Sequence, residues 1–136
     1  AEEAAEAEKK ADEMEEYFRK QGTYSGTVSW LRNVAVRYNN PIAAYPMELH
    51  VIRIGEIAFA TNSFELYLDF GDRIKGRSPA VQTFLIQLCG PGSYLSASRS
   101  DKGGSYGSVP ASACVSAAGG QQLVESTVAI LTGMFR

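Results

Sequence analysis

The spacing of apolar side chains predicts two helices in the first 40 residues. Residues 1–20 are rich in Ala and Glu, contain no Gly or Pro, and carry large apolar side chains only at Met14, Tyr17 and Phe18. This pattern is typical of a mostly solvated helix that docks by one end. The run TVSWLRNVAVRY, which begins at Thr27, places apolar residues at i, i+3 and i+4 spacing. It predicts a short amphipathic helix.

The next segment changes to a β-like pattern. The run MELHVIRIGEIAFATN is rich in β-forming residues on both sides of Gly55-Glu56. We expect a tight turn at this pair and a strand on each side. His50, which is the only histidine, lies in the first of these strands. A lone histidine within a strand indicates a structural role.

A strand, a helix and a second strand are predicted to follow one another from residue 57. Apolar spacing from Phe64 to Ile74 indicates a helix that begins at Asn62 or Ser63. The run AVQTFLIQLC then resembles a strand that is buried on both faces of a parallel sheet. The strands at 57–61 and 82–89 should therefore lie parallel in a βαβ unit.

The rest of the chain completes the predicted fold. Residues 90–120 are rich in Gly, Ser and Ala, which indicates a long irregular loop. The run QQLVESTVAILTGMF closes the chain as an amphipathic helix. The predicted class is α/β: a βαβ unit with a mixed sheet, flanking helices and a long Gly-rich loop, within a larger domain. We divide the chain into a charged helix at 1–22 and an α/β portion at 23–136.

Composition excludes some classes of function. The formal net charge is −2, and no run of Lys and Arg is interleaved with aromatic residues, so nucleic-acid binding is not expected. No apolar run approaches the ~20 residues of a transmembrane helix. The chain begins at Ala1 in helix-like sequence, so we expect it to belong to a longer protein. Cys89 and Cys114 fit no zinc-knuckle spacing and are interpreted as inert buried thiols or as one disulfide.

Three side chains are candidates for chemistry because of their place relative to the predicted strands. Glu65 follows the first parallel strand and Tyr94 follows the second. Ligands collect beyond the carboxyl ends of parallel strands, so both side chains should point toward one edge of the sheet. Tyr106 lies between glycines in GGSYGS, where the backbone can approach a ligand or make a tight turn. Glu65 also has a structural explanation, since Asn62-x-x-Glu65 is close to a helix capping box.

One long stretch of the chain resembles a known family. The run ELHVIRIGEIAFATNSFELYLDFGDRIKGRSPAVQTFLIQLCGPGSYLSASRSDKGGSYG, followed by QQLVESTVAIL, is similar to the C-terminal part of the catalytic domain of bacterial proteins related to neutral, non-lysosomal ceramidases. The resemblance covers roughly residues 47–132 and is closer to uncharacterised relatives than to proven ceramidases. Those enzymes are zinc-dependent amidases that split ceramide into a sphingoid base and a fatty acid.

The resemblance assigns expected roles to individual residues. The family's metal-binding glutamate lies in a Pro-Gly-Glu-Phe-like turn, and NSFEL places it on Glu65, without the Pro-Gly. The family's loop tyrosine lies in a Gly-Tyr-Val-Thr-Thr-like run, and GSYLSAS places it on Tyr94. A later family tyrosine corresponds to Tyr106. Ser96 and Ser98 stand near the family's threonines.

The resemblance implies a zinc-dependent hydrolase of N-acyl, lipid-like amides, with Glu65 and Tyr94 as metal ligands and Tyr94 and Tyr106 as catalytic groups. The two remaining histidine ligands would come from a missing N-terminal part of the same protein, so these residues alone would be inactive. The parent protein would be exported, to the periplasm or beyond. Two alternatives stay open: a non-catalytic degenerate relative that serves as a binding or structural module, and an interaction role for the acidic N-terminal helix.

Overall fold

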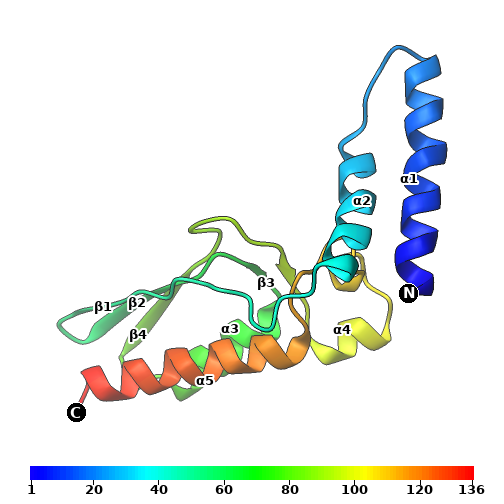
Figure 1. Ribbon diagram of the computed structural model, residues 1–136. Coiled ribbons are helices and arrows are strands. Elements are labelled where there is room, and N and C mark those ends of the chain that lie inside the picture. The colour runs from blue at the N-terminus through cyan, green and yellow to red at the C-terminus, as the bar shows by residue number, and fades with distance from the viewer. The chain divides into compact units, whose positions relative to one another are not determined.

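The computed structural model describes all residues from Ala1 to Arg136 and contains two compact units. Unit 1 comprises Ala1–Ala44, and unit 2 comprises Tyr45–Arg136 (Figure 1). The molecule is mixed α/β, as the sequence predicts. The division differs from the boundary after residue 22 that the charge pattern suggests, because the second helix packs on the first.

Unit 1 is a pair of helices, α1 (Glu2–Lys20) and α2 (Gly26–Asn39), which lie side by side in Figure 1. The buried face of α1 consists of small residues, namely Ala4, Ala7 and Ala11. These alanines recur at helical spacing, so the first helix packs along most of its length, and the prediction that it docks by one end is wrong. Large side chains alone were too few to reveal this face.

A three-stranded sheet forms one layer of unit 2. Its strands are β1 (Val51–Ile54), β2 (Ile57–Thr61) and β4 (Gln82–Ile86), in the order β1-β2-β4. The antiparallel hairpin of β1 and β2 turns at Gly55, whose φ of 60° suits glycine. β2 and β4 pair in parallel with Phe59 opposite Phe84. Both the hairpin and the parallel pair confirm the sequence-based predictions.

Two helices of unit 2, α3 (Leu68–Arg77) and α5 (Ala117–Met134), cover one face of this sheet (Figure 1). The α3–α5 contact is close because Gly120 leaves room for the ring of Phe70, which is 1% exposed. Two hydrogen bonds of 2.7 Å join Arg77 to Glu125 between the same helices. The bond from the Arg77 guanidinium is the largest cause that lowers the pKa of Glu125 to about 2.

The prediction that the second parallel strand is buried on both faces is wrong for these 136 residues. On β4 the side chains of Thr83 and Leu85 face the helices, whereas Phe84 and Ile86 are 45% and 44% exposed. The strand also ends at Ile86 rather than at residue 89. The apolar run is therefore a strand with apolar side chains on both faces, and the helices of unit 2 cover only one of these faces.

The second sheet was not predicted. It consists of β3 (Glu65–Leu66) and β5 (Tyr94–Leu95), which pair in parallel. The helix predicted to begin at Asn62 or Ser63 begins instead at Leu68. The region 90–120 is not one irregular loop, because it holds β5, a short helix α4 (Ser98–Lys102), a 3-10 turn η1 (Tyr106–Ser108) and the start of α5.

Cys89 and Cys114 are both exposed, so the prediction of buried thiols is wrong. The structure joins them by no disulfide. None of the helices is both long enough and apolar enough to span a bilayer.

Candidate functional site

The candidate site is built on the two-residue ladder of β3 and β5. Glu65 stands directly opposite Tyr94 in this ladder, and Leu66 stands opposite Leu95. The amide of Glu65 donates to the carbonyl of Ser93 at 3.0 Å, and the amide of Tyr67 donates to the carbonyl of Leu95 at 3.1 Å. The structure thus brings the two predicted site residues together across neighbouring strands.

Glu65 does not cap a helix. It lies in β3, two residues before the N-cap of α3 at Tyr67, and it is exposed. The acid in the first turn of α3 is Asp69, which pairs with Arg99 at 2.9 Å. Asn62 accepts a 2.9 Å hydrogen bond from the Phe64 amide and so closes a local turn, not a capping box. The capping interpretation of Glu65 is therefore wrong.

The carboxylate of Glu65 interacts with the phenol of Tyr94. Burial of the half-buried Tyr94 side chain is the largest cause that raises its pKa above the ordinary value of 10, and the hydrogen bond to Glu65 is the second. The charges of Glu65, Tyr106 and Tyr67 raise the pKa further. At neutral pH the Tyr94 phenol is therefore protonated and donates to the carboxylate.

Two further tyrosines surround this pair. The rings of Tyr94 and Tyr106 meet edge to face with their centroids 5.5 Å apart. The Tyr67 hydroxyl lies 2.9 Å from the Ser105 hydroxyl and accepts a 3.2 Å hydrogen bond from the Gly107 amide. Tyr67 therefore fixes the turn that carries Tyr106. Sequence reasoning assigned Tyr67 to a helix face and missed this role, although its spacing of two residues from Glu65 is that of a strand.

A glycine-containing segment holds β5 against β3. At Gly92 a Cβ atom would lie 1.9 Å from the backbone oxygen of Ser63. The amide of Cys89 donates to the Asn62 carbonyl at 2.9 Å, and the Gln87 side chain accepts from the Leu66 amide at 2.5 Å. The segment 89–92, which leads into β5, therefore packs directly on the residues that precede Glu65.

The remaining candidates lie apart from this cluster or are enclosed. His50 is exposed at the start of the β-hairpin and lies 3.5 Å from the Glu48 carboxylate. Ser96 is 2% exposed and donates to Asp101, so it is enclosed by protein. Ser98 is exposed at the start of α4.

The donor set of the cluster fits part of a metal site. Carboxylate oxygens are suitable zinc ligands, and zinc sites in proteins have three or four protein ligands. No group of three or more His, Cys, Asp or Glu side chains in this chain could hold a metal ion. Within the cluster, the exposed Glu65 carboxylate is a ligand type that zinc accepts, and the Tyr94 phenol is its hydrogen-bonded neighbour.

A small open groove of about 170 Å³ lies beside the cluster. Its apolar lining comes from Leu66, Leu68 and Leu85, and Tyr67 belongs to both the groove and the tyrosine cluster. Small-molecule pockets usually measure ~300–1,000 Å³, so this groove is too small to enclose a lipid-like molecule by itself.

No protein-family model, curated protein or solved structure matches this chain.

The Glu65–Tyr94 hydrogen bond predicts a pH dependence. Because the folded chain raises the pKa of Tyr94, this stabilisation is complete below about pH 10 and is lost as the pH rises through the folded pKa. Replacing Glu65 by Gln should move the Tyr94 titration toward lower pH. An NMR titration with labelled tyrosine rings measures this, and Glu48→Gln should leave the curve unchanged. A Tyr94 curve that does not respond to Glu65→Gln would contradict the interaction.

Proposed function

We propose that unit 2 supplies the Glu65–Tyr94 half of a zinc-dependent amide hydrolase site, similar to that of neutral ceramidases, which acts on an N-acyl, lipid-like substrate. One observation carries the proposal: Glu65 is an exposed carboxylate with no capping role, held by a protonated phenol across a parallel strand pair. The zinc and the type of reaction in this proposal come from the sequence resemblance to ceramidase-like proteins described above.

The residues of this chain have distinct roles in the proposed site. The Glu65 carboxylate and the Tyr94 oxygen would hold the metal from adjacent strands. When bound, zinc polarises a carbonyl oxygen and lowers the pKa of a coordinated water. As an alternative to holding the metal, the protonated Tyr94 phenol can donate a hydrogen bond to an oxygen that gains negative charge during amide cleavage. Tyr106 packs its ring against Tyr94 and so restricts the position of the phenol.

The proposal requires polypeptide beyond these residues. As the resemblance implies, two histidine ligands would come from another part of the same protein, and no group of three or more His, Cys, Asp or Glu side chains in residues 1–136 could hold a metal ion. The small groove beside the cluster could hold only part of an acyl chain, so the rest of the substrate-binding surface would lie in that other part of the protein as well. Residues 1–136 alone are therefore expected to be inactive.

A hydrolysis assay tests the proposed function. The full-length protein should release fatty acid from an N-acyl sphingoid base, and Glu65→Gln should lower kcat/KM by at least 100-fold with folding retained. The matched control is Glu48→Gln, since Glu48 is another exposed carboxylate of unit 2 whose side chain is 91% exposed. If the wild-type protein cleaves no amide, or if Glu65→Gln retains full activity, the site is not catalytic. The Glu65–Tyr94 pair would then only join two strands of a binding or structural module.

A further inference from the structure

Glu65, Tyr94 and Tyr106 bring a carboxylate and two aromatic rings together at an exposed place on unit 2. Glu65 is exposed, and Tyr106 is 58% exposed. The rings of Tyr94 and Tyr106 meet at an interplanar angle of 82° with their centroids 5.5 Å apart, so they form two walls at a right angle. The Glu65 carboxylate accepts a hydrogen bond from the Tyr94 phenol. We call these three residues the acidic corner.

The acidic corner carries a negative charge that no ion pair within the chain neutralises. Glu65 belongs to none of the ion pairs of the structure. Besides burial, which is the largest cause, the groups that raise the pKa of the Tyr94 phenol are all acidic, namely Glu65, Tyr106 and Tyr67. The surroundings of the corner therefore favour a bound cation over an anion.

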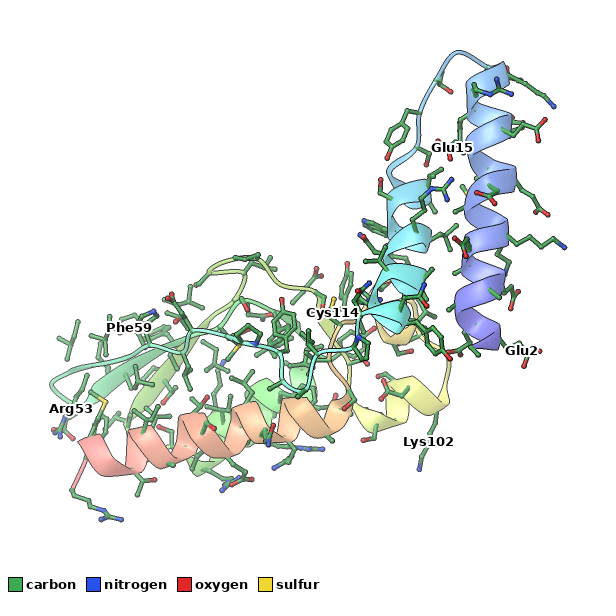
Figure 2. The ribbon with its side chains drawn as sticks, viewed as in Figure 1. Glu2, Glu15, Arg53, Phe59, Lys102 and Cys114 are labelled. Carbon is green, nitrogen blue, oxygen red and sulfur yellow. The ribbon has the colours of Figure 1, made fainter.

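The basic residues that lie closest in the sequence are directed elsewhere. The chain between Tyr94 and Tyr106 contains Arg99 and Lys102. The Arg99 guanidinium pairs with the Asp69 carboxylate of α3 at 2.9 Å. Lys102 is exposed and points outward from the end of α4 (Figure 2). A cation that balances the charge of Glu65 therefore comes from outside these residues.

The groups of the acidic corner match the chemistry of a primary ammonium group. This group carries three N–H donors and no acceptor. An ionised carboxylate can accept about four hydrogen bonds, and Glu65 receives one from Tyr94. Because the Tyr94 phenol donates its own proton to Glu65, its oxygen can accept another. A cation is also attracted to the face of a tyrosine ring when it lies within ~6 Å of the ring centroid.

We infer that the acidic corner binds the primary ammonium group of a small organic amine, with Glu65 as its charge partner and the rings of Tyr94 and Tyr106 as its walls. The inference goes beyond the proposed hydrolysis and does not rest on it. Cleavage of an amide releases an amine, so the corner also suits a product of the proposed reaction. Zinc and an ammonium group would both use the Glu65 carboxylate, so each excludes the other.

A titration with n-butylammonium tests the inference. The full-length protein, with labelled tyrosine rings and with metal removed by a chelator, is titrated while the ring signals of Tyr94 and Tyr106 are followed by NMR. We expect both signals to shift and to saturate. The matched neutral probe is 1-butanol, which has the same length and no charge, and it should shift neither signal.

Substitutions assign the binding to the acidic corner. Glu65→Gln should weaken n-butylammonium binding about 10-fold, because it removes the charge partner and leaves an amide of similar shape. Glu48→Gln, at another exposed carboxylate of unit 2, should bind the amine as the wild type does. Tyr106→Leu should also weaken binding, because it removes one of the two ring walls.

Three results would overturn the inference: ring signals that do not saturate with n-butylammonium, equal shifts with 1-butanol, or undiminished binding by Glu65→Gln. Addition of zinc separates the inference from the proposed function. Displacement of the bound amine by zinc would support both. Amine binding that zinc does not affect would retain the ammonium site and reject the zinc site.

Discussion

Gly92→Ala is expected to separate β5 from β3 and to dismantle the candidate site. The added Cβ would lie 1.9 Å from the Ser63 backbone oxygen, and backbone cannot move aside as a side-chain end can. We expect a loss of about 3 kcal/mol in the free energy of unfolding, at the upper end of ordinary overpacking costs. Urea denaturation measures this loss. Amide hydrogen exchange at Glu65 and Tyr67 should accelerate. The Glu65 amide donates to the carbonyl of Ser93, just before β5, and the Tyr67 amide donates to the carbonyl of Leu95 in β5.

Gly76→Ala is the matched control for Gly92→Ala. Gly76 lies in α3, and its added Cβ would meet nothing within 4 Å. Gly76 lies in the last turn of the helix, so this variant should stay within about 0.5 kcal/mol of the wild type. Equal effects of the two substitutions would contradict the tight approach at Gly92.

Phe70→Ala is expected to have the largest effect on the stability of unit 2. Phe70 is 1% exposed, and its ring fills the space that Gly120 leaves between α3 and α5. Truncation of a buried phenylalanine usually costs ~3–5 kcal/mol, because it removes apolar contacts and leaves a cavity. Thermal or urea unfolding of the chain measures this cost.

Leu68→Ala on the same helix serves as the control. Leu68 is 74% exposed, so its truncation removes little buried surface, and a change within about 0.5 kcal/mol is expected. If Phe70→Ala destabilises no more than Leu68→Ala, the packing of α3 on α5 is not the main source of stability in unit 2.

The parts of the fold that the sequence predicted are those with a regular apolar period. The hairpin at Gly55-Glu56 has alternating residues on both sides of a turn, and β2 pairs with β4 as the βαβ pattern requires. The same topology placed Glu65 and Tyr94 beyond the ends of these strands. The structure brings the two residues together in the β3–β5 ladder.

The second sheet could not be predicted because each of its strands has only two residues, too few to show a period. The segment looked helical from its start because Phe64, Tyr67, Leu68, Gly71 and Ile74 follow helical spacing. In the structure Phe64 lies just before β3, and α3 begins only at Leu68. The sequence therefore suggested a capping role for Glu65. Only the hydrogen bonds from Glu65 and Tyr67 to the neighbouring segment assign this stretch to a strand.

β4 shows how an apolar pattern can give a wrong expectation of burial. The run AVQTFLIQLC has apolar residues on both sides of the strand, which predicts burial on both faces. The helices of this chain cover only the side of Thr83 and Leu85. Phe84 and Ile86 on the other side are 45% and 44% exposed, so the pattern records two apolar sides of which unit 2 covers one.

The zinc content of the full-length protein tests the central claim most directly. The account predicts about one zinc per chain after metal-free purification and equilibration with zinc, and weaker binding in both Glu65→Gln and Tyr94→Phe with the fold retained. Glu48→Gln should bind zinc as the wild type does. A protein that binds no zinc, or that binds it equally well without the Glu65 carboxylate, would contradict the account.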